Sequence, residues 1–325
     1  MLPQFPIESN ESSPAKMSNE RVKVSIIIVN WNRKDDTLEC LSALSKCSLS
    51  KIEAQIIVID NASTDGSIEA IRAFDIKDFD LKLIKNQKNL GFAKPNNQGI
   101  LAAKVWGADF ILLVNNDLLV SENLIEKLVS VAKEHPRVGA ISPKIYFSKG
   151  FEFHKDRYKK TEVGRVIWYA GGDIDWDNVI GSNHGVDDVD EGQYEKTLET
   201  DFATGACMLL RAEALKQVGI LDEKYFMYLE DGDISVRLKK HGWGVLYTPK
   251  AHAWHKVAQS SGIGSELNDY FITRNRLYFG LKYAPLRAKF ALFREAFRFL
   301  FAGRVWQKRA VRDFVLLRFG RGSFK

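Results

Sequence analysis

Short apolar runs alternate with helical patterns through the first half of the chain, and this alternation constrains the fold more than any other feature. Five runs rich in branched aliphatic residues have the length of buried strands; they are 22–29, 56–59, 81–84, 110–114 and 138–141. Between them, apolar residues recur at helical spacing, up to about Ser45, through Ile71, up to Trp106, and over 122–135. Strands and helices that alternate at this spacing predict parallel βαβ units and an α/β fold with a mostly parallel central sheet.

The pattern changes after residue 145. Residues 145–200 are rich in Gly, Asp, Trp and Tyr and have little periodicity, so we expect strands and surface loops that shape a substrate opening. Regular patterns return as a strand over 202–211, a short helix to Val218, a helix that starts near Glu230, and strand segments at 245–247 and 251–255. From Ser265 onward, helix is predicted to dominate.

Composition excludes several classes of protein. Three cysteines without a CxxC pair do not form a disulfide framework or a zinc site. No apolar run approaches the roughly 18–20 residues of a membrane span, and residues 1–20 lack the apolar segment of a signal peptide, so we expect a disordered lead-in there. Neither a GxGxxG nor a GxxxxGK[ST] motif is present. A nucleotide would therefore need another means of holding its phosphates.

The strand at 110–114 ends in three polar residues, Asn115, Asn116 and Asp117. Ligands of open α/β sheets lie just past the carboxyl ends of the strands, where a carboxylate can hold a hard cation against phosphates. The alternative is an ordinary turn made by Asn and Asp. A divalent cation at Asp117 is the natural substitute for a glycine-rich loop.

Seven short segments, in order along 22–260, resemble those of the family 2 glycosyltransferases, which have a GT-A fold. The similarity is greatest to the rhamnosyltransferase-like branch of bacterial polysaccharide assembly. The segments are 29–32 (VNWN), 59–66 (IDNASTDG), 89–92 (NLGF), 114–117 (VNND), 204–206 (TGA), 228–234 (YLEDGDI) and His255.

The resemblance implies a GT-A catalytic domain over 21–262, followed by a helical C-terminal region over 263–325. It implies an inverting, metal-dependent enzyme that moves a sugar, with rhamnose as one candidate, from a dTDP-, UDP- or GDP-linked donor. The implied acceptor is a lipid-linked or polysaccharide glycan in cell-surface glycan synthesis. A nucleotidyltransferase is the alternative, but the glycine-rich loop expected after its first strand is absent. A second alternative is a catalytically decayed, membrane-bound nucleotide-sugar-binding protein.

The resemblance also assigns a metal site and a catalytic base. Asp117 takes the place of the last carboxylate of the family's DxD motif, which reads Asn-Asn-Asp here, and His255 would complete a site for Mg²⁺ or Mn²⁺. The alternative for His255 is a capping or core histidine. Asp231 resembles the general base that activates the acceptor hydroxyl. Its neighbours Glu230 and Asp233 are candidates for acceptor contacts or for helix capping.

The resemblance places the nucleotide-sugar donor at the carboxyl ends of the predicted strands and at the loop before the helix that reaches Trp106. Asp60 resembles the residue that binds the nucleotide base; the alternative is the first residue of an Asx turn, and both can hold together. The other predicted donor contacts are Asn30, Asn32, Asn61, Asn89, Gly91, Asn115 and Asn116.

The C-terminal region carries most of the positive charge. From Lys282 to Lys325 there are twelve Lys and Arg residues against two acidic residues, although the whole chain has a net charge of +6. Arg274 and Arg276 are candidates for contacts with a phosphate of the donor or of a lipid acceptor. Phe290, Phe293, Phe297, Leu300 and Phe301 fall on one helical face. We therefore expect a peripheral protein on the inner, anionic face of the cell membrane, with a helix packed on the domain as the alternative. No nucleic-acid-binding module accompanies the charge.

Overall fold

The computed structural model describes residues 21–257 and 265–325. The predicted lead-in over 1–20 and the predicted domain boundary at 262/263 lie outside these residues. The first half alternates as predicted: β1 (Val22–Asn30), α1 (Lys34–Leu44), β2 (Ile52–Asp60), α2 (Ser67–Arg72), β3 (Asp80–Lys85), α3 (Ala93–Trp106), β4 (Phe110–Asn115), β5 (Leu118–Val120), α4 (Leu124–Glu134) and β6 (Val138–Phe147). All five predicted strands are present, and β2 and β6 are longer than their apolar runs.

The second half contains the short strands β7 (Ile167–Tyr169), β8 (Gly172–Asp175), β9 (Ile180–Asn183) and β10 (Leu198–Glu199), with a 3-10 turn at Lys155–Arg157. It continues with β11 (Cys207–Arg211), α5 (Ala212–Val218), α6 (Glu230–Lys240) and β12 (Gly244–His255). The two segments predicted near its end form one strand, β12, whose pairing with β6 shifts register between Thr248 and His252. The helices α7 (Glu266–Tyr283), α8 (Leu286–Ala302) and α9 (Val305–Val315) complete the chain.

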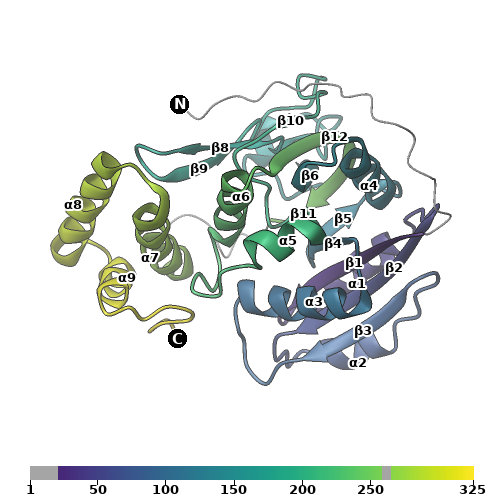
Figure 1. The fold of residues 1–325 in the computed structure, drawn as a ribbon, viewed down its shortest axis with the longest axis horizontal. Helices are drawn as coiled ribbons and strands as arrows, with labels where there is room; N and C mark the ends of the chain where they lie inside the picture. Colours follow the sequence, from purple (N-terminus) through teal and green to yellow (C-terminus); the bar gives the residue numbers. More distant parts are fainter. Residues whose placement is uncertain (1–20, 258–264) are drawn as a thin grey trace.

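One large sheet organises the molecule, with the strand order β10-β12-β6-β11-β4-β1-β2-β3 (Figure 1). Strands β1 to β4 pair in parallel, and β6 pairs in parallel with β12. Since β11 is antiparallel to both β4 and β6, these two groups run in the same direction. The ends of β1, β2, β4 and β12 therefore lie at one edge of the sheet, together with the start of β11.

Alternating side chains of the central strands fill two cores, one on each face of the sheet. Ile26 and Ile28 pack with residues of α1, α2 and α4. Ile27, between them, packs with residues of α3, α5 and α6 on the opposite face. Burial on both faces explains why β1 is a continuous apolar run rather than an alternating one. It also fixes the register, because a shift by one residue would exchange the faces.

The helices α7, α8 and α9 pack against one another, and Figure 1 shows them beside α6 and the β8–β9 hairpin. The buried side chains of α7 include Tyr270, Phe271 and Leu277, which join α7 to the body. By contrast, α8 buries only Ala288, Leu292 and Ala296. None of the helices in the described ranges has the length and hydropathy to span a bilayer.

Candidate active site

The ends of β1 and β2 are joined by a buried polar network. Asn30 and Asp60 are register partners, and both are fully buried. The Asn30 amide donates to Asp60 Oδ2 at 2.8 Å and to Ser63 Oγ at 3.0 Å, while the Ser63 N–H donates to Asp60 Oδ1 at 2.9 Å. The structure thus gives Asn30 a positioning role, in place of the direct nucleotide contact that we predicted. The contact of Asp60 with the nucleotide base stays a prediction.

Three other predicted donor residues lie around this network. Asn116 is partly buried and donates to Thr37 Oγ1 at 3.0 Å and Asn30 Oδ1 at 3.3 Å. Asn32 is exposed, with φ 52°, and its side-chain oxygen accepts from Thr64 N–H at 2.7 Å. The Asn115 N–H donates to Ala206 O at 2.8 Å and ties the end of β4 to the segment before β11. Asn32, Asn115 and Asn116 thus surround the strand exits, and only the first is exposed.

Asn61 fastens the loop that precedes α3. Its amide donates to Asn89 Oδ1 at 3.0 Å and to Gly91 O at 2.8 Å, and its oxygen accepts from Leu90 N–H at 3.1 Å. Gly91 has φ 84°, and a Cβ there would lie 2.5 Å from the carbonyl oxygen of Phe226. Only glycine fits this close approach, which brings the predicted donor loop against the segment before Asp231.

That segment, residues 226–229, is strained. Phe226, Tyr228 and Leu229 have φ values of 67°, 67° and 72°, which L-residues rarely adopt. Such strain persists only where the surroundings impose it, and it is common at active sites. Here the Phe226 carbonyl accepts from the N–H groups of Phe92 and Ala93 at the start of α3, at 2.6 and 3.2 Å.

Two buried side chains of α7 hold the same segment from the other side. The Asn275 amide donates to the carbonyls of Tyr225, Met227 and Tyr228 at 2.9, 2.7 and 2.9 Å. Arg274 donates to Tyr225 O at 2.9 Å and to Gly320 O at 2.6 Å. Because the Arg274 side chain is fully buried, the structure contradicts its predicted phosphate contact. Sequence patterns gave Asn275 no role, although it adjoins Arg274.

Asp231 lies in the first turn of α6, directly after the strained segment. Its two oxygens accept from Gly205 N–H at 2.9 Å and from Gly232 N–H at 2.8 Å, and the residue is partly exposed. Burial raises the pKa of its carboxyl above the ordinary value, although the two N–H donors oppose this effect. Gly205 precedes Ala206, which bonds to Asn115. Asp231 therefore lies at the same sheet edge as Asn115–Asp117.

The neighbouring acids differ from Asp231. Asp233 is fully buried and accepts from Tyr225, Tyr283 and Arg237 at 3.1, 2.7 and 2.7 Å, and it also pairs with Lys282. This carboxylate is therefore structural, and the predicted acceptor contact is wrong for it. Glu230 is buried, and its Oε2 has no hydrogen-bond partner among the described residues. Burial raises the pKa of Glu230 well above its usual value.

Asp117 and His255, the two predicted metal ligands, lie next to each other. The pairing of β5 with β12 places His255 opposite Leu118, and His255 Nε2 lies 3.1 Å from Asp117 Oδ1. Trp168 packs edge-on against the imidazole, with the ring centroids 4.5 Å apart. Asp117 Oδ1 and His255 Nδ1 are buried without a hydrogen-bond partner in the described parts of the chain. No group of three or more metal-ligating side chains gathers within residues 21–257 and 265–325.

The raised pKa of Asp231 predicts the pH dependence of any reaction in which it acts as a base. Only the carboxylate accepts a proton, so kcat/KM should fall as the pH drops through the pKa of Asp231. Since burial raises this pKa, the fall should lie at higher pH than for an exposed aspartate. A pH profile of kcat/KM measures it. A fall at or below about pH 4, the ordinary aspartate pKa, would contradict the assignment.

Comparisons with known proteins identify relatives of this chain among the glycosyltransferases. The family model described as "Glycosyltransferase like family 2" matches residues 21–280. The chain is 29% identical over 221 residues to N-acetylglucosaminyl-diphospho-decaprenol L-rhamnosyltransferase of Mycobacterium tuberculosis. The aligned region covers 64% of this chain and 68% of the relative. It is 24% identical over 255 residues to the low-salt glycan biosynthesis hexosyltransferase Agl10 of Haloferax volcanii, with 78% and 74% covered.

A solved structure supports the fold. The mannosyltransferase PcManGT of Pyrobaculum calidifontis, in complex with GDP-Man and Mn²⁺, superposes with a TM-score of 0.52 and 17% sequence identity. The similarity covers 94% of this chain and 78% of PcManGT. The predicted GT-A fold is thereby confirmed.

Proposed function

The chain belongs to the glycosyltransferase-like family 2, and we propose that it transfers a sugar, with inversion, from a nucleoside-diphosphate sugar to a lipid-linked glycan acceptor. The observation that carries the proposal is the position of Asp231, a partly exposed residue, at the same sheet edge as the Asp117–His255 pair. The named M. tuberculosis relative is a rhamnosyltransferase whose name includes a diphospho-decaprenol. Rhamnose and a polyprenyl diphosphate acceptor are therefore the first pair to test.

In the proposed reaction, Asp231 accepts the proton of an acceptor hydroxyl. The hydroxyl oxygen then forms a bond to the anomeric carbon as the bond from that carbon to the diphosphate oxygen breaks on the opposite face. The two N–H donors on Asp231 fix its orientation. Asn61 and Gly91 hold the donor loop against residues 226–229, so the base and the donor loop keep one relative position.

The residues present fit a divalent cation. The 3.1 Å between Asp117 Oδ1 and His255 Nε2 is close to the roughly 3 Å between adjacent ligands of a Mg²⁺ ion with bonds of 2.0–2.1 Å. Asp117 Oδ1 is buried and, apart from this close approach of His255, makes no hydrogen bond to the described residues, so a cation between the two side chains would satisfy it. When bound, the cation would neutralise the charge of the leaving diphosphate. Two protein ligands suffice, because Mg²⁺ commonly takes its others from substrate phosphates and water.

Substitution of His255 tests the metal site. We expect His255→Gln to weaken Mn²⁺ binding in the presence of UDP, GDP or dTDP by at least about tenfold, because one direct ligand is lost. Thermal-shift titration of Mn²⁺ with each nucleotide measures this without turnover. His252→Gln is the matched control, since His252 lies on the same strand but stacks on Tyr146 at 5.8 Å. Equal Mn²⁺ affinity in both variants would remove His255 from the site.

The proposed function itself is tested by transfer assays. Purified chain, Mn²⁺ and dTDP-, UDP- or GDP-sugars are incubated with a polyprenyl diphosphate acceptor that carries N-acetylglucosamine. Products are analysed for the anomeric configuration of the new linkage. An inverted product that disappears with a chelator supports the proposal. A retained configuration, or transfer that is insensitive to the chelator, would contradict the mechanism.

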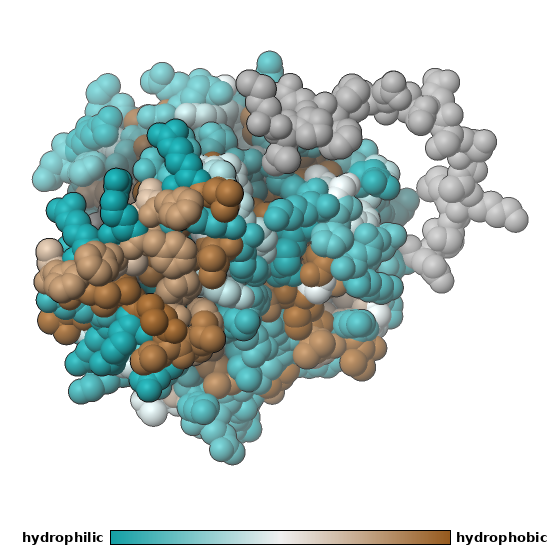
Figure 2. Space-filling view, turned by 60° about the vertical axis from the view of Figure 1, so that its left-hand side comes forward, coloured by the Kyte–Doolittle hydropathy of each residue, from teal (hydrophilic) through white to brown (hydrophobic). Residues whose placement is uncertain are grey.

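Membrane association, on the anionic inner face of the cell membrane, is also part of the proposal. On α8, Phe290, Phe297 and Phe301 are 74%, 64% and 70% exposed. Figure 2 shows a band of hydrophobic surface on this side of the molecule, with hydrophilic side chains around it. Exposed aromatic residues beside Arg287, Arg294 and Arg298 are typical of a helix at the surface of an anionic membrane.

A further inference from the structure

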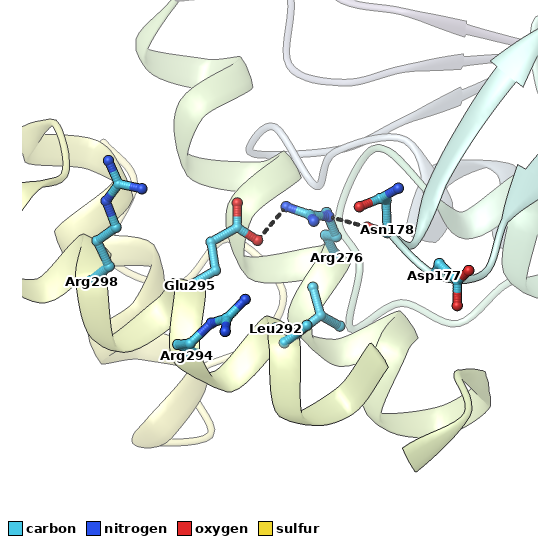
Figure 3. Close-up of a pocket in the computed structure, with 8 residues that line it drawn as sticks. Asp177, Asn178, Arg276, Leu292, Arg294, Glu295 and Arg298 are labelled. Atoms are coloured by element: carbon cyan, nitrogen blue, oxygen red, sulfur yellow. Dashed lines mark hydrogen bonds and ion pairs between the residues drawn. The ribbon is translucent and has the colours of Figure 1, made fainter. Parts of the chain in front are cut away.

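A cavity of about 390 Å³ lies outside the candidate active site, between the turn of the β8–β9 hairpin and the helices α7 and α8. Figure 3 shows the residues that line it. Asp177 and Asn178 come from the hairpin turn, Arg276 from α7, and Arg294, Glu295 and Arg298 from α8. The volume falls in the range of small-molecule sites, about 300–1,000 Å³.

One of the three guanidinium groups is fixed in place. Arg276 Nε donates to Asn178 O at 2.9 Å, and its Nη1 lies 2.7 Å from Glu295 Oε2. Arg276 therefore joins the hairpin turn to both helices. Arg276 lines the cavity, so it stays a candidate for the predicted contact with a phosphate.

The other two guanidinium groups are unpaired. Arg294 and Arg298 lie one turn apart on α8, and Figure 3 shows them extending to the same side of the helix as Glu295. Neither has a hydrogen bond or an ion pair to any other described residue. Two unpaired guanidinium groups one turn apart repel each other, and the planar forks of Arg match the oxygens of a phosphate.

We infer that this cavity binds the phosphate or diphosphate head of a membrane lipid. The same helix supplies the second observation: the exposed Phe293 and Phe297 directly precede Arg294 and Arg298. Successive helical residues point about 100° apart, so the arginines border the apolar face. With that face on the bilayer, Arg294 and Arg298 lie at the level of the lipid phosphates.

A series of packing contacts links the wall of the cavity to the candidate base. Trp176, next to Asp177, stacks on Phe279 of α7 with ring centroids 5.7 Å apart. The Phe279 ring lies 3.7 Å from the position of a Cβ on Gly232, whose N–H donates to Asp231. These contacts connect the hairpin turn that lines the cavity to the helix turn that carries the base. On this point the inference rests on the proposed function: a lipid phosphate in the cavity would hold its sugar near Asp231.

The test measures binding of the whole chain to vesicles without donor. Three vesicle types are compared: phosphatidylcholine alone, with phosphatidylglycerol, and with a polyprenyl diphosphate. Arg294→Gln/Arg298→Gln is set against Arg287→Gln/Lys308→Gln, which removes the same charge from the C-terminal helices outside the cavity. Melting temperatures confirm that both double variants fold.

We expect the cavity variant to lose at least about tenfold in affinity for the two anionic vesicle types, because two charged hydrogen-bond donors to the lipid phosphate are removed. The control variant should lose clearly less. Asp177→Asn should strengthen binding, because it removes a negative charge from the cavity wall. Preference for polyprenyl diphosphate assigns the site to the acceptor, and equal binding of phosphatidylglycerol assigns it to bulk lipid.

Equal loss in the two double variants would overturn the inference, because general membrane electrostatics would then explain the binding. This readout is independent of turnover. A chain that transfers sugar but shows equal loss refutes the phosphate site alone. A chain that binds as expected but transfers no sugar refutes the proposed function alone.

Discussion

Replacement of Asp231 by Asn is expected to reduce the rate of sugar transfer by about 10²- to 10⁴-fold, the usual contribution of a general base. The amide has nearly the shape of the carboxylate but cannot accept the proton of the acceptor hydroxyl. Donor affinity should be unchanged, because the predicted donor contacts lie on other elements. Steady-state assays give kcat and KM for the donor, and a nucleotide-binding titration checks that the donor site is intact.

Glu230→Gln is the control for that experiment. Burial raises the pKa of the Glu230 carboxyl and so favours its neutral form. The neutral amide has nearly the same shape, so the substitution should leave transfer nearly unchanged. The two substitutions alter adjacent residues on the first turn of α6. The assignment of Asp231 as the base would be wrong if Asp231→Asn transferred sugar at the wild-type rate. It would also be wrong if Glu230→Gln abolished transfer.

The sequence predicts the fold well for strands that are buried on both faces of the sheet, because such strands are continuous apolar runs. β1 and β4 are such strands, and their polar ends lie at the sheet edge where we predicted the site. Short strands are harder to predict because their pairing depends on distant partners. β5 has three residues and is defined by its pairing with β12, more than 130 residues later.

The candidate site was predictable as a set of residues but not as a set of roles. The motifs predicted one site of Asp60, Asp117, Asp231 and His255 along the carboxyl edge of the sheet, and their roles stay a prediction. Which side chain faces a ligand depends on burial, and periodicity does not reveal it for a helix buried on several sides, such as α7. Arg274 therefore resembled a phosphate ligand, whereas the structure directs it to the carbonyls of residues 225 and 320.

Asn275→Ala is expected to have the second large effect, on stability and on catalysis together. The substitution removes the Asn275 donor from the carbonyls of Tyr225, Met227 and Tyr228, while the Tyr225 carbonyl keeps its bond from Arg274. An orphaned buried polar group costs about 1–3 kcal/mol, so the free energy of unfolding should fall by about 2–5 kcal/mol. The strained residues Tyr228 and Leu229 should then relax and move Asp231, which lowers kcat further. Urea denaturation and steady-state kinetics measure the two effects separately.

Asn268→Ala provides the matched control, because Asn268 lies on the same helix and its side chain makes no hydrogen bond within residues 21–257 and 265–325. It should change neither stability nor kcat appreciably. The two readouts distinguish a merely structural role from a positioning role. If Asn275→Ala lost stability but kept the wild-type kcat well below its melting temperature, the segment 226–229 would hold Asp231 without Asn275. If kcat falls by more than the unfolded fraction explains, the strained backbone is part of how this chain positions its base.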